Sequence, residues 1–253
     1  MKEFLHIFKY YAIRTYRRPI VWALYLGLPV GLTLINAVAN LGLGPGNFAP
    51  VGIIVTLFIL SFQFFSSELM YYDIFTTLRG NVADRLYMAP IKKKAFFAGA
   101  LINNWIFSIF QAAAIFTVVY LVFPDNVYPS FWLLAVMVLM VSVLAQLKGI
   151  LMPYIAKTRK SADGISAIIC FGMMFLSGGL LVSFGDSPFA EFLMTRSNPL
   201  ALAWSALQRD VQYQSGFIPD PSDFIITNII ILAVIIVATF ALITILGRNR
   251  KTI

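Results

Sequence analysis

The chain has 253 residues, of which 60% are hydrophobic and 12% are charged, and its formal net charge at pH 7 is +8. A basic chain can bind nucleic acid, but that function needs a hydrophilic basic surface. This composition leaves no room for one, so no nucleic-acid partner is expected. The single cysteine, Cys170, excludes an intrachain disulfide, and the single histidine, His6, argues against a metal site, because metal ligands cluster. We expect an all-α polytopic membrane protein, with six transmembrane helices in a single domain over residues 1–253.

The first nineteen residues are predicted to form an amphipathic helix on the membrane surface. One helical face gathers the mostly apolar side chains of Phe4, Leu5, Phe8, Tyr11, Ala12 and Thr15. Basic residues, including Lys9, Arg14 and Arg17, lie mostly opposite and would face anionic lipid or a cytoplasmic partner. Pro19 ends this helix or turns the chain into the first transmembrane span.

Six apolar zones follow, each long enough for a helix of about 20 residues, which crosses a hydrocarbon core of roughly 30 Å. They cover residues 20–40, 48–68, 95–123, 131–153, 164–184 and 224–246. Seventeen of the nineteen Lys and Arg residues fall on the side of this pattern that holds both termini. Because basic residues mark the cytoplasmic side, both termini are expected in the cytoplasm, and the chain is expected in the cytoplasmic membrane.

The segment between the second and third spans has a helical period of its own. Its apolar positions Leu78, Val82, Leu86 and Ala89 lie on one side, its polar positions Asn81, Asp84 and Arg85 lie on the other, and Pro90 stops it. Such a helix across the cytoplasmic surface would transmit a push from a soluble partner into two spans at once. An ordinary amphipathic loop helix has the same period, so the pattern leaves both interpretations open.

The longest segment on the opposite side, residues 185–223, is rich in proline and carries two basic residues, Arg196 and Arg209. Within it, residues 199–211 are predicted to form a short amphipathic helix with Leu200, Ala203, Trp204 and Leu207 on one face. The alternative is a plain loop in which Trp204 and Phe192 anchor the chain at the membrane interface.

Polar residues within the spans are candidates for a translocation path. They are Asn36, Gln63, Asn103, Asn104, Gln111 and Gln146. The alternative is hydrogen bonding between helices, worth about 0.6–2 kcal/mol for each residue. Asn103 and Asn104 are adjacent and point in different directions on a helix, so at most one of them is expected to line a path.

Three charged residues, Glu68, Asp73 and Lys148, lie near the predicted inner ends of spans, where they are expected to snorkel toward the headgroups. No charge is expected deep in any span. This pattern disfavours a secondary carrier driven by protons or sodium, which places carboxylates at mid-depth. It also disfavours an intramembrane enzyme, which needs converging nucleophilic, acid-base or metal groups.

Three segments resemble elements of the ABC-2 type permeases, the membrane subunits of type-2 ABC exporters. The block from Gly80 to Pro90 ends in Arg85-Leu-Tyr-Met-Ala-Pro90 and resembles the family's "G-T-L-E-x-L-L-x-x-P" segment. The run Phe175-Leu-Ser-Gly-Gly179 resembles its "F-L-S-G" element. The run Ser197-Asn-Pro-Leu200, with Arg209 ten residues beyond the proline, resembles the family's extracellular proline followed by a short helix with a late arginine.

The resemblance implies that a second permease subunit, identical or paralogous, pairs with this chain and that each docks a cytoplasmic ABC ATP-binding subunit, two copies in all. It implies ATPase-coupling roles for Leu78, Arg79, Gly80, Asp84, Arg85, Leu86 and Pro90. It also implies that two short re-entrant helices between the fifth and sixth spans form an outer gate, with candidate residues Ser177, Gly178, Gly179, Pro199 and Arg209. The chain has no G-x-x-x-x-G-K-[ST] loop, so the partner is expected to bind ATP and Mg²⁺ and to hydrolyse the ATP.

The aromatic content, 23 Phe, 11 Tyr and 4 Trp, favours a hydrophobic or amphipathic cargo such as a drug, an antimicrobial peptide or a lipid-like molecule. The same family also exports cell-surface polysaccharides, and the sequence leaves that alternative open. A non-ABC secondary carrier and a structural membrane scaffold are the remaining alternatives.

Overall fold

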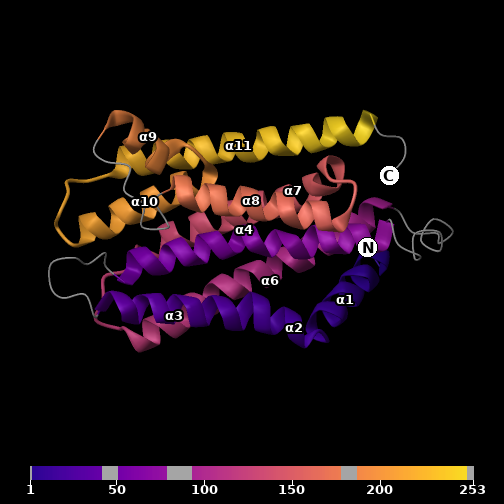
Figure 1. Ribbon diagram of the computed structural model, residues 1–253, viewed down its shortest axis with the longest axis horizontal. Helices are drawn as coiled ribbons and strands as arrows, with labels where there is room; N and C mark the ends of the chain where they lie inside the picture. Colours follow the sequence, from indigo (N-terminus) through magenta and orange to yellow (C-terminus); the bar gives the residue numbers. More distant parts are fainter. Residues whose placement is uncertain (1, 42–50, 79–92, 178–186, 250–253) are drawn as a thin grey trace.

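The computed structural model describes residues 2–41, 51–78, 93–177 and 187–249, and all the regular secondary structure within these ranges is helical. The elements run in chain order as α1 (Lys2–Tyr16), α2 (Pro19–Trp22), the π-helix η1 (Ala23–Gly27), α3 (Leu28–Leu41), α4 (Val51–Leu78), α6 (Lys93–Val122), α7 (Phe131–Ile155), α8 (Arg159–Leu176), α9 (Pro188–Arg196), α10 (Pro199–Gln214) and α11 (Ser222–Asn249). The long helices lie side by side in one bundle (Figure 1).

Within the described ranges, five helical stretches are long and apolar enough to cross a membrane. They are Pro19–Ala39, Val51–Thr76, Ala98–Val122, Phe131–Ile155 and Ser222–Gly247. Helices suit this role because a helix satisfies its own backbone hydrogen bonds where no water is present. The predicted fifth span, residues 164–184, begins within α8, and its last residues lie outside the described part of the chain, so a count of six spans stays a prediction.

The chain bends between α1 and the first span. Helix α1 ends at Tyr16, Arg18 is extended with φ −101° and ψ 99°, and α2 begins at Pro19. Proline at the first helical position is favourable, because its fixed φ suits a helix and its missing N–H costs no hydrogen bond there. Figure 1 shows the resulting angle between α1 and the α2–α3 stretch, at the end of the bundle where the N-terminus lies.

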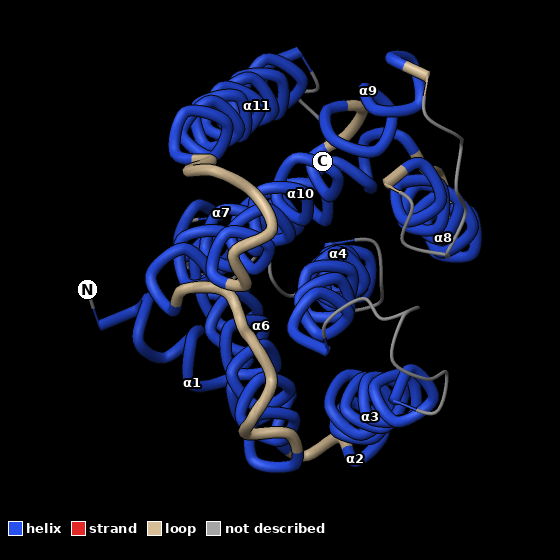
Figure 2. The backbone as a smooth tube through the Cα atoms, turned by 90° about the vertical axis from the view of Figure 1, so that its left-hand side faces the viewer, coloured by secondary structure: helices blue, strands red, loops and turns tan. Residues whose placement is uncertain are grey.

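Helix α4 lies at the centre of the bundle, with α3 on one side and α8 and α10 on others (Figure 2). Helix α7 lies close to it at Gly149. A Cβ atom on Gly149 would lie 2.7 Å from the Met70 Cβ and 2.8 Å from the Ser67 carbonyl oxygen. The absence of a side chain therefore lets α4 and α7 pack closely.

Two short helices, α9 and α10, lie at the end of the bundle opposite the N-terminus (Figure 1). Helix α10 contains the predicted segment 199–211, and of the side chains predicted to share one face, Leu200, Ala203 and Leu207 are buried and Trp204 is half-buried. The plain-loop alternative for this segment is therefore wrong. Asn198 begins the helix by accepting a hydrogen bond from the Ala201 N–H at 2.9 Å.

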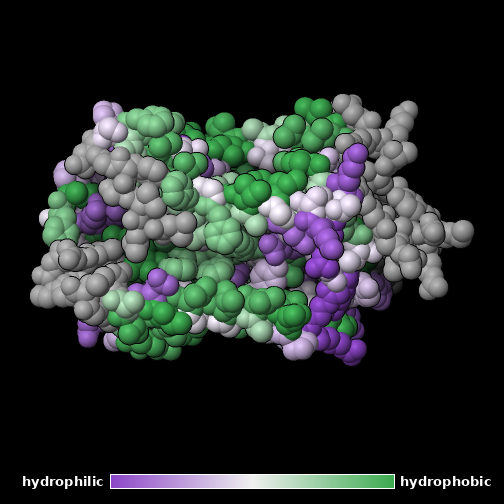
Figure 3. All heavy atoms as spheres, viewed as in Figure 1, coloured by the Kyte–Doolittle hydropathy of each residue, from purple (hydrophilic) through white to green (hydrophobic). Residues whose placement is uncertain are grey.

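The surface matches a membrane protein. Apolar side chains cover the middle of the bundle in the face shown in Figure 3, and hydrophilic side chains gather toward the end where α1 lies. Exposed large hydrophobic residues occur on most of the long helices, for example Ile35, Phe110, Val136, Ile168 and Val237. Such extensive apolar exposure is unusual for a soluble chain, and it is what contact with lipid requires.

Candidate functional site

Helix α4 has one accessible face along its length. From Val51 to Thr76 its side chains are buried except for seven half-exposed ones, Ile54, Phe58, Phe62, Phe65, Glu68, Tyr72 and Thr76. Their spacing of three or four residues places all seven on a single side of the helix. We call these residues the α4 face.

The part of the α4 face nearer the start of the helix is aromatic. The rings of Phe58 and Phe62 stack with their centroids 6.1 Å apart, and Phe62 and Phe65 lie 6.0 Å apart. Phe65 also packs edge to face on Phe171 of α8 at 5.4 Å. The rings therefore form a continuous apolar surface from α4 to α8.

The other part of the α4 face opens into a pocket of about 450 Å³ between α2, η1, α4 and α8. We call it the charged pocket. It is lined by Arg18, Ile20, Val21, Leu24, Tyr25, Glu68, Leu69, Tyr71, Tyr72, Arg159 and Asp163. Two basic and two acidic side chains thus line the pocket together with apolar residues, so the pocket can contact a molecule that has both polar and apolar parts.

Tyrosine side chains contact the charged groups of this pocket and hold them in place. The Tyr25 hydroxyl donates to Glu68 Oε2 at 3.2 Å, and the Tyr71 hydroxyl donates to Asp163 Oδ1 at 2.9 Å. The guanidinium of Arg159 lies 4.2 Å from the centre of the Tyr72 ring and 3.9 Å from the Asp163 carboxylate. Cation–π contact of this kind holds a guanidinium in place without neutralising its charge.

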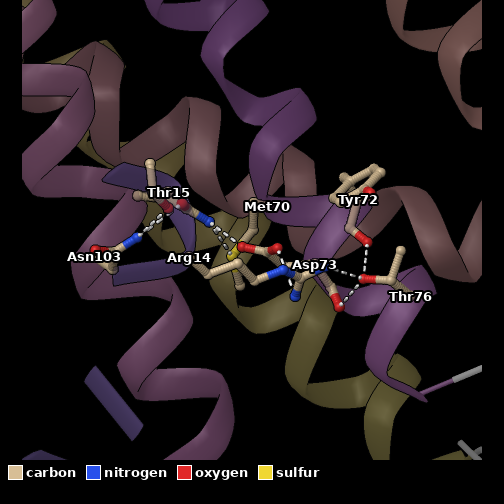
Figure 4. A network of polar contacts seen from close by, with 8 residues as sticks. Arg14, Thr15, Met70, Tyr72, Asp73, Thr76 and Asn103 are labelled. Carbon is tan, nitrogen blue, oxygen red and sulfur yellow. Dashed lines mark hydrogen bonds and ion pairs between the residues drawn. The ribbon is translucent and has the colours of Figure 1, made fainter. Parts of the chain in front are cut away.

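A buried polar network joins α1, α4 and α6 (Figure 4). Arg14 forms an ion pair with Asp73 at 3.3 Å and donates to Thr76 Oγ1 at 3.1 Å. Asn104 donates to the second Asp73 oxygen at 3.4 Å, and Asn103 donates to Thr15 Oγ1 at 3.2 Å. The network fixes α1 against the end of α4.

Two expectations from the sequence fail at this network. Asp73 was expected to snorkel toward the headgroups, but it is buried and 6% exposed. Arg14 was placed on the α1 face directed toward lipid or a partner, but it packs against α4. The helical period of α1 assigns each residue to a face by its polarity alone. It does not include the carboxylate of Asp73 on α4, which attracts the Arg14 guanidinium into the bundle.

Lys148 also departs from the expectation that it snorkels. Its side chain is 8% exposed. The ammonium donates to the Phe64 carbonyl oxygen at 3.1 Å, to Ser166 Oγ at 3.0 Å and to Cys170 Sγ at 3.0 Å. These contacts tie α7 to α4 and α8, so the charge is held inside the bundle by hydrogen bonds.

The remaining candidates for a translocation path differ in their burial and in their hydrogen-bond partners. Gln63 donates to the Ser108 carbonyl oxygen at 2.9 Å and accepts from the Ser108 hydroxyl, joining α4 to α6. Gln111 and Gln146 are buried, and among the described residues their amide groups have no hydrogen-bond partner. Asn36 is exposed and bonds within α3 to the Leu32 carbonyl oxygen. The six candidates do not gather at one place on the α4 face.

Asn228 is a polar residue of the last span that the sequence analysis missed. It is fully buried and donates to the Leu202 carbonyl oxygen at 3.0 Å and to Ser205 Oγ at 3.1 Å. These bonds join α11 to α10. The same rule that selected the other polar residues within spans would have found it.

The candidate gate residues lie around α9 and α10. Ser177 caps the end of α8, Pro199 opens α10, and Arg209 forms an ion pair with Glu191 of α9 at 3.4 Å. The Arg209 guanidinium also lies 3.8 Å from the centre of the Phe224 ring of α11. Together these contacts link the two short helices to the last span. The other two candidates, Gly178 and Gly179, lie outside the described residues.

Most of the predicted coupling residues also lie outside the described residues, namely Arg79, Gly80, Asp84, Arg85, Leu86 and Pro90. Leu78 is the last residue of α4, and α6 begins at Lys93. The segment that holds these residues therefore continues directly from the helix that carries the α4 face.

A search of curated proteins found no match to the chain. The family model for ABC-2 type transporters matches residues 1–210, which is most of the chain and includes the α4 face, the charged pocket and the buried network. This agrees with the all-helical membrane architecture. The protein belongs to the ABC-2 type transporter family, as a multi-pass permease.

Proposed function

We propose that the chain is the permease subunit of an ATP-driven exporter, and that the α4 face contacts an amphipathic cargo as it crosses the cytoplasmic membrane. The observation that carries this proposal is the composition of that face. It passes from Phe58, Phe62 and Phe65 to the charged pocket at Glu68 and Tyr72 within a single helix.

Charged groups at membrane depth are costly, and where they persist they usually serve a function. A purely apolar cargo would gain nothing from contact with the charged pocket, and a purely polar cargo would gain nothing from contact with the aromatic rings. An amphipathic molecule makes favourable contacts with both. Its tail gains roughly 25 cal/mol for each Å² of apolar surface buried, and its polar head stays in contact with charged side chains. Drugs, antimicrobial peptides and lipid-like molecules share this character.

The energy would come from a separate ABC ATP-binding subunit, with which permeases of this family pair. Two such subunits and a second permease, identical or paralogous, complete the proposed assembly. Residues 78–90 would receive the motion of the ATPase, because they continue from α4. The ion pair of Arg14 with Asp73 and the hydrogen bonds of Lys148 would then carry a displacement of α4 to α1, α7 and α8.

The orientation proposed for this assembly follows the distribution of charge. Both termini and residues 78–90 lie on the cytoplasmic side, and α9 and α10 lie on the outer side, where they would close the exit as a gate. The ion pair of Arg209 with Glu191 supports the gate, because it joins the two short helices that would have to separate.

Transport into inside-out vesicles tests the role of the α4 face. The probes are fluorescent single-chain amphiphiles with anionic, cationic or zwitterionic heads, and an oligosaccharide of similar mass. With the ATPase subunit coexpressed, at least one amphiphile should accumulate when ATP is added. Phe62→Ala should lower that rate by about fivefold to tenfold, because one aromatic contact is worth about 1 kcal/mol beyond its buried area.

The matched control is Phe131→Ala, which removes an exposed ring at the start of α7, away from the α4 face. This variant should transport at the wild-type rate. Accumulation of the oligosaccharide and of none of the amphiphiles would contradict the proposal and favour polysaccharide export.

A further inference from the structure

We propose that the charged pocket binds the head group of a zwitterionic amphiphile, with the ammonium on Glu68 and the anionic group on Arg18. This inference rests on the proposed export of amphipathic compounds and names the class of head group. It is based on the fact that some charged side chains of the pocket form salt bridges and others do not.

Glu68 forms no salt bridge with any residue that the structure describes. It accepts one hydrogen bond, from the Tyr25 hydroxyl at 3.2 Å, and its side chain is half-exposed on the α4 face. A hydroxyl is a neutral donor, and Lys148 and Arg159 offset the negative charge of the carboxylate at longer range, without a salt bridge. A carboxylate without a salt bridge beside apolar Val21 and Leu24 is costly, and a ligand that carries a positive charge lowers that cost.

Arg18 is the complementary case. Within the described part of the chain, three guanidinium groups gather around the Tyr72 ring, at 5.6 Å for Arg14, 4.9 Å for Arg18 and 4.2 Å for Arg159. Arg14 pairs with Asp73, and Arg159 lies 3.9 Å from Asp163. Arg18 alone of the three forms no salt bridge to a described carboxylate. Its guanidinium is therefore open to a phosphate or a carboxylate, which it can bind through two parallel hydrogen bonds.

Among the described residues, the pocket thus retains one charge of each sign, Glu68 and Arg18, that forms no salt bridge. A cationic ligand would neutralise Glu68 and leave Arg18 unpaired, and an anionic ligand would do the reverse. A head group with an ammonium and an anionic group satisfies both at once. The volume of about 450 Å³ lies within the usual range of small-molecule sites, about 300–1,000 Å³.

The tail of such a ligand has a continuous place to lie. Leu24 and Leu69 line the apolar side of the charged pocket. One helical turn along the α4 face from Glu68, the ring of Phe65 begins the aromatic surface that reaches Phe171 of α8. A head group in the pocket therefore leaves its hydrocarbon chain against phenylalanine rings.

Lipid binding to the purified permease tests this inference without ATP or a partner subunit. Native mass spectrometry would measure the binding of three lipids with identical acyl chains, a phosphatidylethanolamine, a phosphatidic acid and a cationic trimethylammonium-propane lipid. The wild type should bind the phosphatidylethanolamine about tenfold more tightly than either of the others, since each added charge contact is worth about 1.4 kcal/mol or more.

The variants separate the two charges. Glu68→Gln keeps the shape and an acceptor for the Tyr25 hydroxyl, and it should reduce phosphatidylethanolamine binding about tenfold while leaving phosphatidic acid unchanged. Arg18→Gln should weaken both. The matched controls are Glu191→Gln at the opposite end of the molecule and Arg17→Gln, whose side chain is exposed and does not line the pocket. Neither control should alter binding.

A lysophosphoethanolamine distinguishes the source of the head group. If the lysophosphoethanolamine binds as tightly as the two-chain lipid, the pocket takes a single-chain cargo. If it binds much more weakly, the pocket holds a bilayer lipid. Both results support a binding site for a zwitterionic head group. The proposed head-group site would be overturned if all three two-chain lipids bound with equal affinity. It would also be overturned if Glu68→Gln and Arg18→Gln left the affinities unchanged. The binding measurement does not depend on transport. A negative binding result would therefore not contradict the vesicle result on the α4 face, and a negative vesicle result would not contradict the binding result.

Discussion

At the scale of single residues, Lys148 explains how a charge is kept inside this bundle. An ammonium has three N–H donors and no acceptor. In this protein each donor has an acceptor, one on the α4 backbone at Phe64 and two on α8 at Ser166 and Cys170. The cost of burying the charge is offset by three hydrogen bonds, which also make Lys148 a junction between three helices.

A double-mutant cycle on Lys148 and Ser166 measures this junction. Ser166→Ala leaves one donor of a buried ammonium without an acceptor, so it should lower the free energy of unfolding by about 1–3 kcal/mol. In the Lys148→Met background the same change should cost less than about 0.5 kcal/mol, because the donor is gone. The unfolding of purified protein in mixed micelles would provide these values.

The control for that cycle is Ser215→Ala, because the Ser215 hydroxyl, at the end of α10, donates to the Val211 carbonyl oxygen of that helix at 2.8 Å and so joins no two helices. It should change the free energy of unfolding by less than about 0.5 kcal/mol. Equal costs of Ser166→Ala in both backgrounds would mean that Lys148 gains nothing from Ser166.

At the scale of the elements, two close approaches position helices of the bundle, one of them against α4. Gly149 admits the backbone of α4 against α7, and Gly99 admits α1 against α6, where a Cβ atom would lie 2.8 Å from the Ile7 side chain. The ion pair of Arg14 with Asp73 then fixes the direction of α1. Because α4 is packed on all its other sides, only the α4 face remains accessible to a cargo.

Alanine at Gly149 should separate α4 from α7. The new methyl group would overlap Met70 and the Ser67 carbonyl, so we expect a loss of about 1–3 kcal/mol in the free energy of unfolding. Gly172→Ala on α8 is the matched control, because no described atom beyond its own stretch of helix lies within 4 Å of its Cβ position. That change should be neutral or stabilising by up to about 1 kcal/mol, since alanine favours a helix. Similar losses for both variants would show that the close approach at Gly149 is unimportant.

At the scale of the whole molecule, α4 connects the two ends of the bundle. It begins near the end that holds α9 and α10 and finishes at Leu78, near the end that holds the N-terminus (Figure 1). The α4 face, the buried network and the junction at Lys148 all include residues of this helix. A displacement at residues 78–90 would therefore reach the proposed cargo surface through one continuous helix.

Copurification in mild detergent tests the proposed assembly. An ATP-binding subunit should accompany the wild-type chain in roughly equal amount, and the double reversal Asp84→Lys with Arg85→Glu should lose it, because reversed charges oppose those of the docking surface. The matched control, Asp125→Lys with Arg196→Glu, reverses two exposed charges elsewhere in the chain and should retain the subunit. Absence of any ATPase from the wild-type preparation would contradict the ABC assignment of the energy source.

The sequence alone was sufficient for the all-helical membrane class and the family. Apolar runs, the distribution of basic residues and the helical period are properties of neighbouring positions, and they predicted an all-helical membrane protein and the helix at 199–211. Motifs around Gly80, Phe175 and Pro199 predicted the ABC-2 family, which the family model confirms.

Only the tertiary structure decided where the charges point and which surface stays open. The burial of Lys148 and the pairing of Arg14 with Asp73 depend on acceptors and carboxylates supplied by other helices. The α4 face exists because other helices cover the remaining sides of α4. A periodic pattern assigns residues to the faces of one helix, but the neighbour that each face meets is set by packing between segments far apart in the chain.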